Sequence, residues 1–123
     1  MRYHLLFAAL LIGFLAAVPA GAGEADVVAV QITATGANLY RFDVTVRHQD
    51  TGWEHYSDRW EVLAPDGRIL ATRKLLHPHE YEQPFTRSLT GVRIEAAVVT
   101  VRVRAHDSEH GFGGAEIERA LAD

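Results

Sequence analysis

The stretch LYRFDVTVR, residues 39–47, decides the fold class of this 123-residue chain, because its side chains alternate between apolar and polar. The even-numbered positions from Tyr40 to Val46 are apolar, and the odd-numbered positions from Arg41 to Arg47 are polar. A period of two residues, carried by β-branched and aromatic side chains, is typical of a strand with one buried and one solvated face. The stretch therefore predicts a half-buried strand of an antiparallel sheet.

The same alternation recurs along the chain, for example from Val99 to Ala105, and turn signals separate the alternating segments. The firmest of these signals is Pro65-Asp66-Gly67, whose residue types favour a tight turn. We predict seven strands, at residues 26–34, 39–47, 58–64, 68–76, 84–90, 97–105 and 115–121. Seven short strands at this spacing predict an all-β fold, a seven-stranded antiparallel β-sandwich that occupies residues 23–123.

Several segments resemble known proteins. Residues 89–94 (LTGVRI) and 99–105 (VTVRVRA) resemble the region between strands E and F of fibronectin type III domains. That resemblance implies a fibronectin type III or immunoglobulin-like sandwich. The combination of WEHY (53–56), LLHPH (75–79) and EQPFTRSL (82–89) resembles a group of uncharacterised bacterial exported proteins, and it implies no known activity.

The first 22 residues have the features of a secretory leader. The segment Leu5–Val18 holds no charged residue and, as a helix, would extend roughly 21 Å, short of the roughly 30 Å hydrocarbon core of a membrane. Pro19 ends this run, and Ala20-Gly21-Ala22 supplies the small residues of a cleavage site. We predict a signal peptide at residues 1–22, cleaved after Ala22, and a periplasmic or secreted mature chain; an uncleaved anchor is the alternative.

Composition narrows the class of protein further. The chain contains no cysteine, so we expect neither disulfides nor a lipid-anchored cysteine, and hydrophobic packing must hold the fold. No segment after the leader is apolar enough to cross a membrane, so we expect no membrane span in the mature protein. The formal net charge is −4, which argues against a nucleic-acid partner.

The histidines are distributed unevenly over the predicted connections. If successive strands run in opposite directions, alternate connections emerge at opposite ends of the sandwich. The first, third and fifth connections contain no histidine. The second, fourth and sixth, at residues 48–57, 77–83 and 106–114, contain every histidine outside the leader: His48, His55, His77, His79, His106 and His110.

This concentration of imidazoles predicts a binding protein, and we name all six histidines as candidate metal ligands. Histidine ligands without cysteine suit Zn²⁺, Cu²⁺ or Ni²⁺ rather than Cu⁺, so zinc or copper(II) is the cofactor that the sequence favours. Acidic residues in the same connections could orient an imidazole through its second nitrogen. For any single histidine, a polar loop residue without a ligand is the competing interpretation.

A second hypothesis needs no metal. Exposed aromatic residues among polar neighbours are typical of recognition surfaces, so an unknown protein or small ligand could bind there. The candidate contact residues are Trp53, Tyr56, Tyr81, Glu82 and Asp107. An enzyme of unknown class is the third hypothesis, but His106-Asp107-Ser108 cannot form a catalytic triad among chain neighbours, and we name no catalytic residue. A response of the imidazoles to pH is a further alternative.

Overall fold

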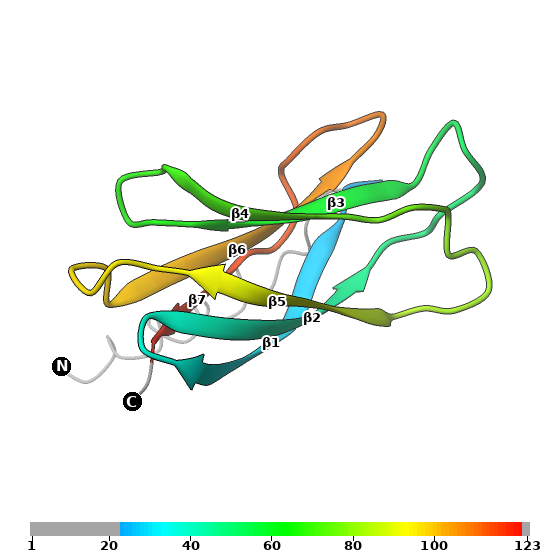
Figure 1. The fold of residues 1–123 in the computed structure, drawn as a ribbon. Helices are drawn as coiled ribbons and strands as arrows, with labels where there is room; N and C mark the ends of the chain where they lie inside the picture. The colour runs from blue at the N-terminus through cyan, green and yellow to red at the C-terminus, as the bar shows by residue number, and fades with distance from the viewer. Residues whose placement is uncertain (1–22, 122–123) are drawn as a thin grey trace, which may run out of the picture.

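The computed structural model describes residues 23–121, which form seven strands and no helix. The strands form two antiparallel sheets, one in the order β1-β2-β5 and one in the order β4-β3-β6-β7 (Figure 1). Their bounds are β1 (Asp26–Gly36), β2 (Leu39–Arg47), β3 (Ser57–Leu63), β4 (Ile69–Lys74), β5 (Phe85–Arg93), β6 (Thr100–Asp107) and β7 (Ile117–Ala120). The prediction of an all-β fold with seven antiparallel strands is confirmed.

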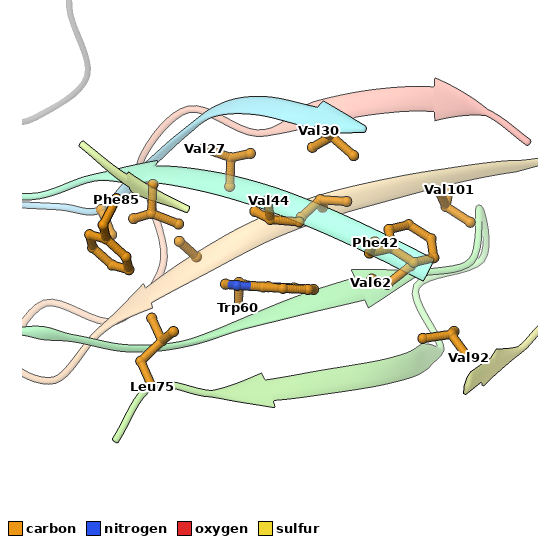
Figure 2. Close-up of a cluster of buried hydrophobic side chains, with 14 of the residues drawn as sticks. Val27, Val30, Phe42, Val44, Trp60, Val62, Leu75, Phe85, Val92 and Val101 are labelled. Atoms are coloured by element: carbon orange, nitrogen blue, oxygen red, sulfur yellow. The ribbon is translucent and has the colours of Figure 1, made fainter. Parts of the chain in front are cut away.

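The core lies between the two sheets and uses the side chains that the alternation predicts. Phe42, Val44 and Val46 of β2 are fully buried, and Trp60 of β3 is fully buried at the centre of the cluster (Figure 2). Burying a side chain of this size contributes about 1.5–3 kcal/mol. The described part of the chain therefore has a continuous apolar core made by both sheets.

Strand β6 differs from its prediction at both ends. Val99, predicted to be a strand residue, precedes the strand and is 64% exposed. The other end extends to Asp107, because β3 continues to pair with it: Ser57 lies opposite Asp107 and Arg59 lies opposite His106. The extension turns His106 outward and Asp107 inward, although we predicted both to lie in a connection.

The connections gather at two opposite ends (Figure 1). At one end, the amide of Ile94 donates to the carbonyl of Asn38 at 3.0 Å, and Arg68 pairs with Glu95 at 3.4 Å. The connections that follow β2, β4 and β6 lie at the other end, and we call them the histidine pole (residues 48–56, 75–84 and 108–116).

The predicted signal peptide, residues 1–22, lies outside the described residues. Within residues 23–121, no helix has the length and apolar character that would let it cross a membrane.

Candidate functional site

The inward-facing rows of β2 and β6 change from apolar to polar where they reach the histidine pole. The buried row that ends at Val46 continues, at the same two-residue interval, with His48 (3% exposed) and Asp50 (6% exposed). In the opposite sheet, the row that ends at Ala105 continues with Asp107, which is fully buried. Ionisable groups from both sheets therefore close one end of the apolar core.

Asp107 is the centre of this arrangement. Its carboxylate lies 3.0 Å from Nε2 of His55, 2.7 Å from Nδ1 of His110 and 3.5 Å from Nε2 of His48. It also accepts backbone N–H bonds from Glu109 at 3.2 Å and from His110 at 3.3 Å. Burial by itself would raise the pKa of Asp107, but these hydrogen bonds outweigh it and hold the pKa below its ordinary value. Asp107 is therefore a charged acceptor for the imidazoles of His55 and His110 and lies beside a third imidazole, that of His48.

Asp50 fixes the orientation of His48 and joins two connections. One carboxylate oxygen contacts Nδ1 of His48 and accepts the amide of Ser57 at 3.1 Å. The other oxygen accepts the amide of His79, in the connection after β4, at 2.6 Å. With Nδ1 held in this way, Nε2 of His48 faces the carbonyl oxygen of Gly23 at 2.9 Å. A histidine held by a carboxylate on one nitrogen presents the other to a ligand, as metal-bound histidines commonly do.

The protonation of the imidazoles follows from these acceptors. Burial would lower the pKa of His48, but the hydrogen bonds to Asp50 and to the Gly23 carbonyl outweigh it and raise the pKa. The hydrogen bond with Asp107 is the main cause that raises the pKa of His110. Burial acts to raise the pKa of Asp50, yet its hydrogen bonds with His48 and with two backbone amides lower it. Two carboxylates with lowered pKa values thus lie against two imidazoles with raised pKa values at this end of the core.

The positions of the donor atoms fit a cation. His48, His55 and Asp107 each offer one ligand atom, and these three atoms lie within 4.8 Å of one another. One oxygen of the Asp107 carboxylate lies 3.5 Å from Nε2 of His48 and the other lies 3.0 Å from Nε2 of His55, both close to the spacing of about 3.3 Å between ligands of a tetrahedral zinc ion. His55, Glu109 and His110 form a second group of the same size. We call these five residues the Asp107 cluster.

The His77-Pro78-His79 segment lies outside both groups. His79 is 5% exposed and stacks on Phe85, with the ring centroids 3.9 Å apart. Burial, followed by the positive charge of Arg87, lowers the pKa of His79, and neither ring nitrogen has a hydrogen-bond partner within residues 23–121. His77 is exposed beside it, with the ring centroids 4.6 Å apart. Their role as ligands stays a prediction.

His106 is also separate from the Asp107 cluster. It projects from the outer face of β6, where its Nδ1 lies 2.7 Å from Asp58 and 3.1 Å from Arg59. Its ring packs edge-on against Phe112 at 4.8 Å. The structure therefore brings together three of the six predicted imidazoles, those of His48, His55 and His110.

The candidate contact residues of the second hypothesis are placed differently. Trp53 is 65% exposed and Tyr81 is 97% exposed, whereas Asp107 is fully buried in its cluster. Tyr56 packs edge-on against Trp53 at 5.5 Å, and Glu82 pairs with an arginine of β5 at 3.2 Å. A hollow of about 300 Å³ lies between the first two connections of the pole. It is lined by Gly52, Trp53, His77, Pro78, Glu80 and Tyr81.

The predicted set of site residues lacks Asp50, Glu109 and Gly23. The sequence does carry a signal for Asp50, since the even-numbered row from Phe42 to Val46 extends through His48 to Asp50. The sequence has no comparable pattern that would predict Gly23. Its contact with His48 depends on the path of residues 23–25 over the histidine pole, which no local pattern specifies.

A comparison with known proteins places this chain beside a longer one. A protein of Halomicrobium mukohataei with the name "Putative lipoprotein" is 42% identical to this chain over 91 residues. The match covers 74% of this chain and 44% of that protein, so the chain spans less than half the length of the curated relative. No family model and no solved structure matches the chain.

Proposed function

We propose that this chain is an exported binding protein that holds a divalent transition-metal ion through His48, His55 and Asp107. The observation that carries the proposal is the convergence of their three donor atoms within 4.8 Å of one another. Imidazole and carboxylate donors without thiolates suit zinc or copper(II). Three protein ligands leave a further coordination position for water or for another group of the protein.

The surroundings of the three donors also support a metal. Asp50 holds His48 by its other nitrogen, and partners of this kind typically change metal affinity by 10–100-fold when they are removed. His110 and Glu109 lie on the exposed side of His55, where they could bind the same ion or a second one. The predicted ligands His77, His79 and His106 belong to the proposal only as separate contributors, because they lie outside the Asp107 cluster.

Titration of the metal-stripped, exported protein with Zn²⁺ and with Cu²⁺, followed by calorimetry, tests this function. We expect saturable binding by the wild type and an affinity about tenfold or more lower for His55→Ala. His106→Ala is the matched control, since it removes an imidazole at the end of β6, next to the pole, that lies with Asp58 instead of Asp107. His77→Ala tests the 77–79 segment in the same assay.

Two results would contradict the proposed function. One is the absence of saturable binding of either ion by the wild-type protein. The other is an equal loss of affinity in His55→Ala and His106→Ala, which would show that any metal uptake reflects dispersed surface histidines.

The exposed aromatic hollow favours a second candidate function, recognition of a protein or small ligand. Trp53 and Tyr81 are large side chains left in solvent within one 300 Å³ hollow, and aromatic anchors are common in recognition surfaces. Cross-linking of the exported protein in living cells tests this candidate. A partner captured by the wild type and by His106→Ala, but lost from Trp53→Ala/Tyr81→Ala, would support it; equal capture by all three would contradict it.

We further propose a fibronectin type III-like fold and a periplasmic or secreted location. The pairing of β4 with β3 supports the former, because the fourth strand of an immunoglobulin constant domain lies in the opposite sheet. The leader-like residues 1–22 and the lipoprotein name of the longer relative support the latter.

A further inference from the structure

The backbone of Gly23 lies among the imidazoles of the Asp107 cluster. Its carbonyl oxygen is 2.9 Å from Nε2 of His48 and 3.3 Å from Nε2 of His55. These two distances fall within the range of about 2.8–3.3 Å between adjacent ligands of a four-coordinate ion, from square-planar to tetrahedral. The Gly23 oxygen therefore lies where a fourth ligand would complete the group formed by His48, His55 and Asp107.

The close approach requires glycine at this position. A Cβ atom on residue 23 would lie 2.9 Å from Cε1 of His110, nearer than real Cβ contacts allow, and 3.1 Å from its Nδ1, nearer than most of them. The φ angle of Gly23 is +95°, in the region that disfavours residues with a side chain. Three imidazoles thus surround one main-chain unit, and that unit is the residue that directly follows the predicted cleavage site after Ala22.

We propose that removal of the leader completes the metal site, because it converts the Gly23 amide nitrogen into a free α-amino group. This inference rests on the proposed metal-binding function and on cleavage after Ala22. The amide nitrogen of an uncleaved chain is a poor ligand, since its lone pair is delocalised into the peptide bond. Hydrolysis of the Ala22–Gly23 bond adds one water, leaves a carboxylate on Ala22 and frees an amine whose lone pair can bind a cation.

The α-amino nitrogen and the carbonyl oxygen of one residue can bind the same ion. The atoms N, Cα, C and O are joined in sequence, so an ion held by N and O closes a five-membered ring. With Nε2 of His48, Nε2 of His55 and the Asp107 carboxylate, this ring gives three nitrogen donors and two oxygen donors. Such a set suits a tetragonal ion, and the proposal therefore commits to copper(II). At neutral pH the amine, with an ordinary pKa of about 7.7–8.0, releases its proton as the ion binds.

The site would consequently be assembled only after export. A precursor still joined to its leader presents the His48 and His55 imidazoles but lacks the amine, so its affinity for copper is that of an incomplete donor set. Cleavage gives the processed chain a chelating pair of donors, the α-amino nitrogen and the carbonyl oxygen of Gly23. Once one donor of the pair holds the ion, binding of the other donor is intramolecular, and this typically increases affinity by 10²–10⁴-fold.

The composition of the chain allows a selective test, because Lys74 is its single lysine. Lys74 is exposed at the end of β4, so Lys74→Arg leaves the α-amino group as the one primary amine of the processed chain. The exported Lys74→Arg protein is divided into two samples, one untreated and one acetylated at the N-terminus. Mass spectrometry confirms that the chain begins at Gly23. The acetylated sample carries an amide at Gly23, as the precursor does, so acetylation alters a ligand rather than the fold.

Both samples are titrated with Cu²⁺ and followed by calorimetry and visible absorption. We expect acetylation to lower the affinity about 100-fold or more and to shift the copper absorption band, because one nitrogen donor is lost. Equal affinity and identical spectra of the two samples would overturn the inference while leaving the proposed function in place. A chain that begins at another residue would also overturn the inference. Failure of both samples to bind Cu²⁺ would overturn the inference, and failure of the wild type to bind Zn²⁺ as well, in the titration that tests the proposed function, would overturn that function itself.

Discussion

Replacement of Asp50 by asparagine tests the buried polar network most directly. The substitution keeps the size of the side chain but removes its charge and one of its two acceptor oxygens. Asp50 accepts from three buried groups: Nδ1 of His48, the amide of Ser57 and the amide of His79. Asparagine has one acceptor oxygen and presents two donor hydrogens, so it cannot satisfy all three groups.

The loss of stability in Asp50→Asn follows from the number of hydrogen bonds that asparagine can accept. The better orientation of the new amide keeps the bonds to His48 and Ser57 and leaves the amide of His79 facing a donor. A buried unsatisfied group costs about 1–3 kcal/mol, and each of the two retained bonds loses about 1 kcal/mol with the charge of its acceptor. We expect a total loss of about 3–5 kcal/mol from the free energy of unfolding. For a domain of this size, that loss lowers Tm by roughly 12–40 °C.

Urea and thermal unfolding of metal-free protein at pH 7, followed by circular dichroism, measure this loss. Asp66→Asn is the matched control: Asp66 accepts the amide of Arg68 at 3.0 Å but lies in an exposed turn at the opposite end, so its change should stay within about 0.5 kcal/mol. A loss below about 1 kcal/mol for Asp50→Asn would refute the reasoning, because the network would then contribute no more than an exposed turn.

Three other substitutions test other parts of the fold. Phe42→Ala removes a fully buried ring, and we expect it to lower the free energy of unfolding by about 3–5 kcal/mol in urea titrations. Burial would raise the pKa of Glu61, but hydrogen bonds from Arg59 and Arg104 outweigh it and lower the pKa. The stability from this depressed pKa is present above the ordinary value of 4.5 and is lost as pH falls through the folded-state value. In thermal scans, Glu61→Gln should therefore be about 2 kcal/mol less stable than wild type at pH 7, and this difference should shrink as pH falls below 4.5. Trp53→Ala removes a mostly exposed ring and should change urea unfolding by less than about 0.5 kcal/mol.

The strands could be predicted from the sequence because their signal is local. Side chains two residues apart share one face, and in residues 42–46 the three apolar positions are the buried ones. The ends of the strands could not be predicted in the same way, because pairing with a neighbour decides them. The alternation in β6 suggests an end near Ala105, yet the register with β3 pairs Asp107 with Ser57 and keeps the strand intact for two further residues.

The candidate site was predictable in its general location but not in its membership. The rule that alternate connections share one end places all six histidines together, and the contacts between Asp50 and His79 join two of those connections. The rule says nothing about the direction of a side chain within a connection. His106 entered the predicted set as a loop residue, but its position in β6 turns it outward, and the same extension makes Asp107 the buried centre.

A purely structural role explains the Asp107 cluster poorly. His48, Asp50 and Asp107 occupy positions where each inward row would otherwise bury apolar side chains, and replacing buried ion pairs by packed apolar residues is often neutral or stabilising by 1–4 kcal/mol. A chain without cysteine has no disulfide to offset that loss. An ion that binds the folded state alone would offset it, since a concentration 1,000 times the Kd adds about 4.1 kcal/mol to stability. The proposed metal therefore accounts for the presence of these ionisable groups at the end of the core. A metal-free network, in contrast, must stabilise the fold by itself, and the free energy of unfolding would not rise when zinc or copper is added.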